Sequence, residues 1–278
     1  MPRAGRTTKP RRERLDRLLV ERGLARSRER AQALVLAGVV RIDGRPAGKP
    51  GTTVSAEAQV TLQAPDHPFV GRGGVKLEGA LNRLGIEAAG RIALDIGAST
   101  GGFTDCLLRR GARRVFAVDV GSGQLDWGLR NDERVVVLEG LNARYLAPTD
   151  LPVPVDLVVI DVSFISLRLI LPPLPAMMAP GAEVLALVKP QFEVGRREVG
   201  RGGVVREPRL HLQALESVAR AASAAGFRVP AGCASPITGA EGNREFFLHL
   251  KTGADVPGSD VQDLLGGMVY GGTESPAD

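Results

Sequence analysis

Two charged residues directly follow apolar runs, a position typical of side chains at the ends of buried strands. Asp161 comes after Val158-Val-Ile, and Lys189 comes after Leu187-Val. If these strands are parallel neighbours, both side chains lie at one crevice. A carboxylate and an amine placed together can orient a hydroxyl group and help to remove its proton. The pattern therefore indicates a site that activates an alcohol.

A lysine acts as a base only when its surroundings favour the neutral amine. An unperturbed lysine, with a pKa near ~10.4, is neutral about once in a thousand at pH 7.4, and lowering that pKa by ~3 units needs roughly 4 kcal/mol. Lys76, which leads into the body of the chain, is a second cation that could supply part of this. Glu245, in Gly242-Asn-Arg-Glu245, could hold Lys76 or the substrate hydroxyl. Either residue alone is more typical of a surface ion pair.

A glycine-rich run follows the first predicted strand of the body and leads from Asp95 into a predicted helix at Phe103. Its glycines permit a tight turn and the close approach of a ligand to backbone N–H groups. The spacing matches neither a nicotinamide-binding loop nor a phosphate loop. Asp119 ends the second predicted strand, where a carboxylate can accept hydrogen bonds from a ribose diol.

The charge of Asp95 favours one cofactor over the others. A carboxylate repels a pyrophosphate, but it attracts the ammonium group of S-adenosylmethionine, whose own carboxylate can meet the loop amides. The sequence therefore predicts S-adenosylmethionine as the cofactor. The candidate cofactor-binding residues are Asp95, Gly97, Ala98, Ser99, Thr100, Gly101, Gly102, Phe103, Asp119 and Asn142.

The residues also distinguish the possible methyl acceptors. Methylation of a pyrimidine carbon needs a cysteine nucleophile, but Cys106 is predicted in the helix after the glycine run and Cys233 in a late strand. Amino-group methylation often uses an Asn/Asp-Pro-Pro-aromatic motif where this chain has Asp161-Val-Ser-Phe164. An alcohol acceptor fits best. The three histidines lie far apart, and no metal site is predicted.

A predicted α/β body positions these residues. Strands are predicted at 91–95, 114–119, 134–138, 156–161, 183–189, 227–233 and 245–250, and helices at 103–110, 166–178 and 208–225. Apolar strands that alternate with helices indicate a mostly parallel sheet covered on both faces.

Positive charge is concentrated in the amino-terminal part of the chain. Residues 1–50 hold 14 Lys and Arg against 5 Asp and Glu, whereas residues 51–278 hold 22 against 26. This predicts a polyanion-binding module on a mildly acidic body. The alternative is a basic disordered tail attached to a neutral domain.

The amino-terminal module has its own pattern of elements. Leu15, Leu18 and Leu19 predict a helix that ends near Gly23, and Ser27 predicts the cap of a second helix that Gly38 ends. Strands are predicted at 39–42 and around 59–62, with a hairpin turn at Asp43-Gly44.

Arginine outnumbers lysine in this module, which suits bidentate contacts to phosphate. The module contains no aromatic residue, so we expect it to recognise folded RNA by shape and backbone rather than by stacking. The candidate RNA-binding residues are Arg14, Arg17, Arg26, Arg28, Arg30, Arg41 and Arg45.

Two parts of the chain resemble known families. Residues 13–63 resemble the S4-type RNA-binding domain, through Arg14-Leu-Asp-Arg-Leu-Leu and Gly38-Val-Val-Arg-Ile-Asp-Gly. The body resembles the FtsJ-like ribose 2′-O-methyltransferases, whose Lys-Asp-Lys-Glu tetrad matches Lys76, Asp161, Lys189 and Glu245. This resemblance implies that Lys189 is the base or the hydroxyl-orienting residue, with Asp161 and Lys76 tuning it.

The chain over about 13–252 resembles the TlyA family of ribosomal RNA cytidine 2′-O-methyltransferases, sometimes labelled hemolysins. The more specific stretches are Gly97-Ala-Ser-Thr-Gly-Gly-Phe and Val188-Lys-Pro-Gln-Phe-Glu. The resemblance implies a Rossmann-like, seven-stranded S-adenosylmethionine-dependent methyltransferase sheet of the α/β class, with a small α+β amino-terminal domain. It further implies an enzyme that acts on ribosomal RNA within ribosomal subunits.

The expected organisation is a basic disordered start (1–12), the S4-like domain (13–63), a linker (64–73), the FtsJ-like domain (74–252) and a tail (253–278). The arginines and glycines of 190–207 predict a mobile flap, or else a solvated loop. No apolar run approaches the ~20 residues of a membrane span, so we expect a cytoplasmic protein that does not meet a membrane. Two alternative functions are a non-catalytic RNA-binding assembly factor and, less favoured, a pore-forming cytolysin.

Overall fold

The computed structural model describes residues 11–25, 27–36, 38–63, 67–239, 241–253 and 261–271. The chain divides into two compact units, Met1–Pro68 and Phe69–Asp278. Both cysteines are buried and free. Within these described ranges, no helix is both long enough and apolar enough to cross a membrane.

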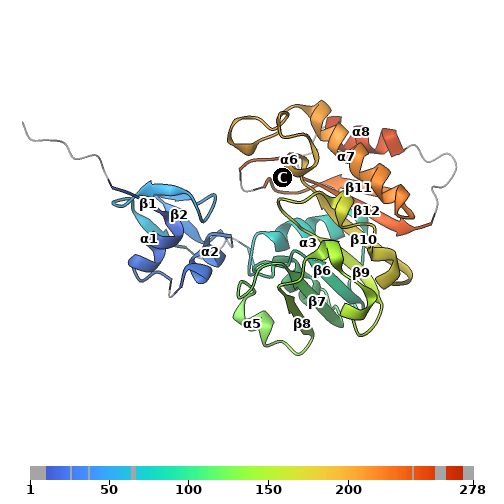
Figure 1. Ribbon diagram of the computed structural model, residues 1–278, viewed down its shortest axis with the longest axis horizontal. Coiled ribbons are helices and arrows are strands. Elements are labelled where there is room, and N and C mark those ends of the chain that lie inside the picture. The colour runs from blue at the N-terminus through green and yellow to red at the C-terminus, as the bar shows by residue number, and fades with distance from the viewer. Residues whose placement is uncertain are drawn as a thin grey trace, which may run out of the picture. The chain divides into compact units, whose positions relative to one another are not determined.

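The first unit packs two helices against short strands (Figure 1). The helices are α1 (Leu15–Glu21) and α2 (Arg28–Leu36), and the strands are β1 (Arg12–Arg14), β2 (Val40–Ile42), β3 (Arg45–Pro46), β4 (Thr53–Ser55) and β5 (Val60–Leu62). Strands β3, β2 and β5 form one antiparallel sheet, and β1 pairs with β4. Leu15, Leu19 and Val40 are fully buried in its small core.

The helix cap and the hairpin turn predicted in the first unit are both present in the structure. The Ser27 hydroxyl accepts a hydrogen bond from the Arg30 backbone N–H at 3.2 Å, as a helix cap does. Asp43 and Gly44 have φ values of 49° and 79° and join β2 to β3, as a tight hairpin turn requires. The pair β1–β4 was not predicted. Residues 1–10 of the expected disordered start lie outside the described residues, whereas Arg12 begins β1.

The second unit is built on a seven-stranded sheet in the order β11-β12-β10-β9-β6-β7-β8 (Figure 1). The strands are β6 (Ile92–Ile96), β7 (Arg114–Asp119), β8 (Val135–Glu139), β9 (Val155–Ile160), β10 (Met178–Val188), β11 (Phe227–Ala234) and β12 (Phe246–Thr252). All are parallel except β12, which runs antiparallel to both of its neighbours. The chain crosses from β8 back to β9 on the other side of β6, which makes a switch point in the sheet.

Apolar side chains cover both faces of this sheet. Leu94, Val158 and Val184 belong to one buried cluster, while their neighbours in sequence, such as Ala93 and Leu157, belong to the cluster on the opposite face. Helices α3 (Gly73–Leu84), α4 (Gly102–Arg109) and α5 (Trp127–Arg130) contribute to the second cluster, and α7 (Pro208–Ala224) and α8 (Val261–Tyr270) to the first. The predicted α/β sheet, covered on both faces, is confirmed.

The predicted helix at 166–178 is wrong. The segment forms only the short 3₁₀ turns η3 (Leu167–Leu169) and η4 (Leu174–Met177) before β10 begins. Pro172 and Pro173 lie between the turns, and proline lacks the N–H that a helix interior needs. The remaining short elements are η1 (Ala143–Tyr145), η2 (Pro148–Asp150), α6 (Pro190–Glu193) and η5 (Arg201–Gly203).

The expected tail contains helix α8, which packs against α7 and β11. Leu265 is fully buried in the main core, and a side chain on Gly232 would collide with Met268. A short apolar run in a Gly- and Asp-rich context therefore docks as a helix because the sheet offers it an apolar surface. The rest of the tail, 254–260 and 272–278, lies outside the described residues, as do linker residues 64–66. Linker residue Phe69 is buried in the second unit.

Candidate active site

The ends of β9 and β10 carry the first two candidate residues. The parallel register pairs Ile160 with Ala186, so Asp161 and Lys189 emerge at the same edge of the sheet. Lys189 Nζ lies 2.5 Å from Asp161 Oδ1. The same amine donates a hydrogen bond to the Ser163 hydroxyl at 3.0 Å. The predicted convergence of Asp161 and Lys189 is present in the structure.

The other two candidates form a second ion pair. Lys76 projects from α3, and its Nζ lies 2.6 Å from Oε2 of Glu245, the residue that precedes β12. Both side chains are almost fully buried. A side chain on Gly239 would lie 2.4 Å from Glu245 Oε1, so the backbone of Gly239 packs closely against this carboxylate.

Electrostatic coupling joins the two ion pairs into one cluster. Burial alone would lower the pKa of Lys76, but the charges of Asp161 and Glu245 outweigh burial and raise it. Burial alone would raise the pKa of Asp161, but the charges of Lys189 and Lys76 outweigh burial and lower it. The charges therefore alternate along the series Lys189, Asp161, Lys76 and Glu245, and the four residues make one continuous network.

The glycine-rich loop between β6 and α4 lies against the end of β9. Gly97 has φ +87°, and a Cβ there would lie 2.3 Å from the carbonyl oxygen of Asp161. Gly101 has φ +96°, and a Cβ there would lie 2.2 Å from Leu129. Only glycine combines these φ values with such close contacts. The loop thus brings backbone N–H groups next to the charged cluster.

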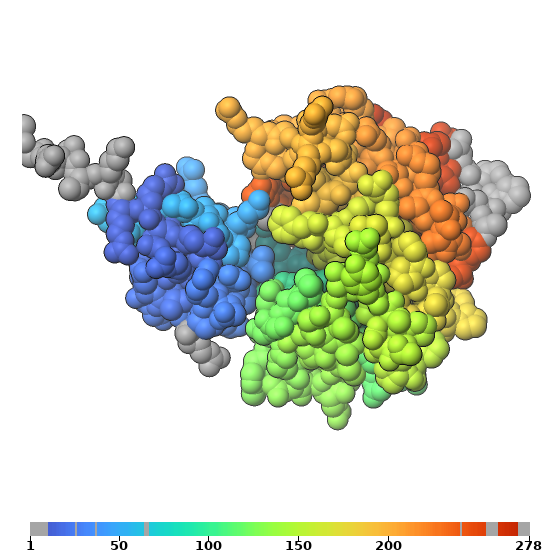
Figure 2. All heavy atoms as spheres, in the orientation of Figure 1, coloured from blue at the N-terminus to red at the C-terminus, as the bar shows by residue number. Residues whose placement is uncertain are grey.

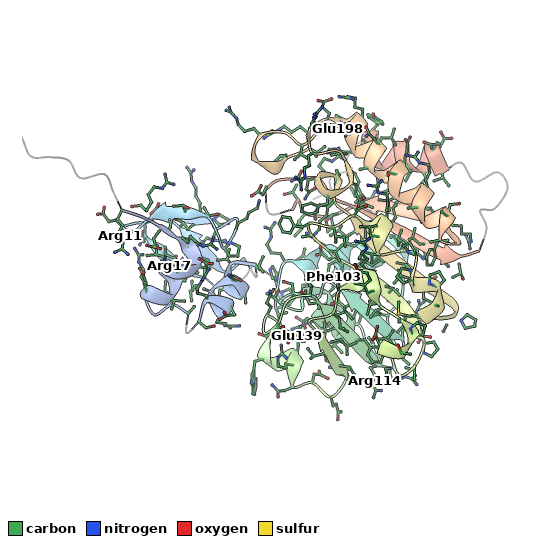
Figure 3. The ribbon with its side chains drawn as sticks, viewed as in Figure 1. Arg11, Arg17, Phe103, Arg114, Glu139 and Glu198 are labelled. Carbon is green, nitrogen blue, oxygen red and sulfur yellow. The ribbon has the colours of Figure 1, made fainter. Side chains whose placement is uncertain are left out.

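A pocket opens beside this loop at the carboxyl ends of β7 and β8. Figure 3 labels Phe103 and Glu139 near this edge of the sheet, and Arg114 at the opposite end of the strands. The pocket is lined by Ala98, Ser99, Ala117, Asp119, Gly121, Gln124, Leu125, Val137 and Glu139. Asp119 accepts hydrogen bonds from the backbone N–H groups of Ser99 (2.8 Å) and Gly121 (2.7 Å). Asp119 therefore organises the walls of the pocket as well as facing it.

Asp95, at the end of β6, is an unusual buried acid. Its Oδ2 accepts a hydrogen bond from the Thr104 hydroxyl at 2.6 Å, whereas its buried Oδ1 has no hydrogen-bond partner in the part of the chain that the structure describes. Burial raises its pKa to about 7, against the opposing effect of the Thr104 hydrogen bond. A buried carboxylate oxygen without a partner favours a cationic ligand group at this position.

Some predicted cofactor residues lie in other environments. Phe103 is buried and stacks on Phe247, with ring centroids 6.1 Å apart. Asn142 is exposed and caps η1 by accepting a hydrogen bond from the Arg144 backbone N–H. Thr100 is buried, and Gly102 begins α4 where a side chain would press on Gly74 of α3. Of the ten predicted positions, only Ala98, Ser99 and Asp119 line the pocket.

The predicted RNA-binding arginines of the first unit differ in their partners. Arg14 and Arg28 pair with Asp16, and Arg17 pairs with Glu13. Arg41, the half-buried member of the set, donates to Gln63 Oε1 and to the Gly38 carbonyl. Arg30 and Arg45 are exposed, and Arg26 lies outside the described residues.

Sequence reasoning missed several residues of the site. Ser163 contacts Lys189, and Glu139 bonds the Gly123 backbone N–H and pairs with Arg130. The position of Glu139 at the end of a predicted strand, like that of Asp119, was a usable signal. The buried Asn243 anchors the loop after α6, through Gly203 and Val205. No pattern in the sequence pointed to that contact.

The segment 190–207, predicted as a flap or a solvated loop, has exposed residues in its middle but is held near both ends. At its start, the buried Glu193 accepts hydrogen bonds from the Ser166 hydroxyl and the Leu167 backbone N–H. Figure 2 shows the segment in amber on the surface of the second unit. Val205 is buried, and its backbone bonds both Asn243 and the His211 ring. Arg196, Arg197 and Arg201 are exposed.

The sheet order, the glycine loop after β6 and the charged cluster at the carboxyl edge together define a methyltransferase body. Comparison with known proteins gives the same class: a model of the FtsJ-like methyltransferases matches residues 69–252, and a model of the S4 domain matches residues 13–60.

Individual relatives narrow the family. The chain is 53% identical to the 16S/23S rRNA (cytidine-2′-O)-methyltransferase TlyA of Mycobacterium tuberculosis, over 88% of this chain and 92% of that protein. It is 39% identical to Hemolysin A of Brachyspira hyodysenteriae, over 85% of this chain and 99% of that protein. A solved structure from Streptococcus thermophilus, provisionally described as a hemolysin, is 44% identical, with a TM-score of 0.70 and coverage of 92% of this chain and 94% of that one. The chain belongs to the TlyA family of FtsJ-like methyltransferases that carry an amino-terminal S4 domain.

Proposed function

We propose that this protein methylates the 2′-hydroxyl of a ribose, that of a cytidine, in ribosomal RNA within ribosomal subunits, with S-adenosylmethionine as the methyl donor. The observation that carries the proposal is the buried network of Lys76, Asp161, Lys189 and Glu245 beside the glycine-loop pocket. The name of the Mycobacterium tuberculosis relative supports both the base and the sugar position. The cytoplasm, where ribosomal subunits are found, is the proposed location.

The residues of the glycine loop and of the pocket beside it offer groups of the right charge for the proposed cofactor. S-adenosylmethionine supplies an electrophilic methyl group, which an oxygen nucleophile can take by in-line displacement. Oδ1 of Asp95, which has no hydrogen-bond partner among the described residues, would receive its ammonium group, and the backbone N–H groups in the first turn of α4 would receive its carboxylate. Asp119, at the end of β7, would accept hydrogen bonds from the ribose diol.

Lys189 is the residue assigned to the 2′-hydroxyl. Its contacts with Asp161 and Ser163 fix the amine in space and leave one N–H direction free to meet a substrate oxygen. In its neutral form, Lys189 would accept the hydroxyl proton with the lone pair that then points in this direction; in its ammonium form, its third N–H would hold the oxygen while the hydroxyl proton passes to solvent water. Asp161 stabilises the positive charge on Lys189, while the charge of Lys76, which pairs with Glu245, favours the ionised form of Asp161.

The S4 domain is assigned to RNA binding. Its arginines outnumber its lysines and lie mostly at the surface, where bidentate contacts to phosphate are available. Neither alternative function is favoured. A non-catalytic assembly factor would not need these two buried ion pairs, and the hemolysin name belongs to a relative rather than to a feature of this chain.

The decisive experiment supplies labelled S-adenosylmethionine to the protein and purified ribosomal subunits. Incorporated label should appear in a nuclease-resistant 2′-O-methyl dinucleotide. Lys189→Ala should lower incorporation by about 10²–10⁴-fold with cofactor affinity nearly unchanged. Lys251→Ala is the matched control, because this lysine pairs with Glu183 in the middle of β10. Label on a base, or full activity of Lys189→Ala, would contradict the proposal.

A further inference from the structure

The first unit contains a buried carboxylate that binds two arginines at once. The Asp16 side chain is fully buried, although it lies in the first turn of α1 on a strongly basic module. Arg14 binds it with two hydrogen bonds, from Nε at 3.0 Å and from Nη2 at 2.8 Å. Arg28, at the start of α2, adds a hydrogen bond at 3.2 Å. Gln32, one turn further along α2, adds another at 3.2 Å.

The hydrogen bonds decide the charge state of this acid. The hydrogen bond from Arg14 is the largest influence and, together with those from Gln32 and Arg28, holds the pKa of Asp16 far below its usual value despite burial. Asp16 is therefore a carboxylate at every physiological pH. A buried charge of this kind persists only while its partners stay in place, so the two guanidinium groups are held where Asp16 needs them.

The two arginines are held but not covered. Their side chains remain 47% and 53% exposed for Arg14 and Arg28, respectively. Each guanidinium has five N–H donors, and most of these are not used by Asp16. Gly51 lies against Arg14, since a Cβ there would lie 3.3 Å from Arg14 Nη2. Helices α1, which carries Asp16, and α2, which carries Arg28, are coloured blue in Figure 2. Arg17 of α1 is labelled in Figure 3.

We propose that Asp16 is a positioning residue for RNA binding: it fixes Arg14 and Arg28 side by side so that their outward N–H groups bind neighbouring backbone phosphates. This inference rests on the proposed RNA-binding function of the S4 domain. Free arginine side chains lose conformational entropy when they bind a phosphate, and tethering them beforehand removes part of that cost. An acid at this position thus strengthens binding to a polyanion.

The proposal reverses the expectation from net charge. Removing a negative charge from a basic module strengthens RNA binding by long-range attraction. In contrast, Asp16→Asn also removes the carboxylate that holds Arg14 and Arg28 in place, and under the proposal this loss weakens RNA binding. Asp16→Asn in the full chain should therefore lower affinity for a fluorescein-labelled RNA hairpin about five- to tenfold near 0.15 M salt. The slope of log affinity against log salt concentration should become shallower, by the amount that corresponds to the loss of about one phosphate contact or more.

The matched control is Glu57→Gln, which makes the same change in charge in the exposed turn between β4 and β5. It should leave affinity unchanged or slightly tighter. An affinity of Asp16→Asn equal to or tighter than wild type would overturn the proposal. If Asp16 has only a structural role, Asp16→Asn will lower thermal stability, but the protein that remains folded will bind RNA with an unchanged dependence on salt. That result would also overturn the proposal.

A second variant keeps the test decisive if Asp16→Asn does not fold. Arg14→Lys combined with Arg28→Lys preserves both charges and Asp16, but lysine cannot form the bidentate contact. This double variant should lose affinity to a similar extent, and adding Asp16→Asn to it should change little further. Unchanged affinity of the double variant would overturn the proposal.

Failure of the inference and failure of the proposed function are distinguishable. If wild-type protein binds the hairpin and methylates ribosomal subunits while the Asp16 variants bind normally, only the inference fails. If wild-type protein neither binds RNA nor transfers methyl groups, the proposed function fails and takes the inference with it. Asp16→Asn should raise the KM for RNA, because the change lies in binding.

Discussion

Two acidic residues, one in each unit, are each surrounded by two cations, yet the cations are of different kinds. Asp16 binds Arg14 and Arg28, whereas Asp161 binds Lys189 and interacts with Lys76. A guanidinium keeps its charge at any working pH and offers several fixed donors, which suits phosphate binding. An amine can change its protonation state when its surroundings change, which suits proton transfer. The choice of cation thus distinguishes an arrangement suited to phosphate binding from one suited to proton transfer.

Location strengthens this difference. Asp161 lies at the carboxyl edge of a parallel sheet, at the switch point where ligands of such sheets bind. In the middle of β10, Glu183 pairs with Arg91, Lys251 and the buried His249. Ion pairs therefore occur at both places. The cluster at Asp161 differs in that it lies against the glycine-rich loop.

The largest effect should come from exchanging one kind of cation for the other. Lys189→Arg preserves the charge beside Asp161 but removes a group that can gain and lose a proton, so kcat should fall about 10³-fold. The measurement is methyl transfer to ribosomal subunits under saturating cofactor. Lys251→Arg, in the cluster around Glu183, is the control and should keep full activity. Residual activity within about tenfold would mean that charge alone suffices at position 189.

Neutralising Asp161 tests the same comparison by changing the acid instead of the cation. Asp161→Asn removes the carboxylate that stabilises both lysines, so kcat should fall about 10²-fold or more, while RNA affinity stays within about twofold. Glu216→Gln, in an ion pair on α7, is the control. A loss of RNA affinity equal to the loss of kcat would show that the two carboxylates do not have separate functions.

An intermediate effect is expected for the buried acid without a cationic neighbour. Burial raises the pKa of Asp95 to about 7, above its usual value of 3.8. Because the folded chain binds this proton more tightly than the unfolded chain, the contribution of Asp95 to stability falls as pH rises from about 4 to 7. Asp95→Asn should thus raise the free energy of unfolding at pH 8 by about 1–3 kcal/mol, measured by urea denaturation without cofactor.

In Asp95→Asn, the affinity for the cofactor should depend little on pH. In the wild-type chain, a cationic group beside Asp95 favours the ionised acid, so cofactor affinity should rise about three- to tenfold between pH 6 and 7.5. Calorimetric titration of Asp95→Asn should show weaker binding and little change over this range. A parallel rise with pH in the variant would assign the titration to another group.

The smallest effect is expected for Ser163, whose hydroxyl accepts a hydrogen bond from the Lys189 amine that also pairs with Asp161. Ser163→Ala removes one neutral hydrogen bond of 3.0 Å from an amine that keeps its ion pair, so kcat should fall about threefold. Ser163→Thr retains the hydroxyl and should restore most of the activity. A loss as large as that of Lys189→Arg would place Ser163 among the groups that contact the substrate.

Local elements were largely predictable because their signals are contained within a few residues. The seven strands of the body were located within a few residues at most boundaries, and Ser27 and Asp43-Gly44 were correctly identified as cap and turn. The helix expected at 166–178 does not form because Pro172 and Pro173 interrupt the segment. Helix α8 was missed because its stability depends on an apolar surface formed by distant strands.

The identities of the four charged residues and of the glycine loop could be read from the chain itself, since strand-end charges and glycine spacing are patterns of adjacent residues. Only the folded chain decides that Lys76 meets Glu245, that Asp161 lies between two lysines, and that Asp95 keeps an oxygen without a partner. The same holds for Asp16, whose burial between two arginines depends on how α1 packs on α2. These properties belong to contacts between elements that are far apart in sequence, and packing rather than local pattern sets the distances on which charge and pKa depend.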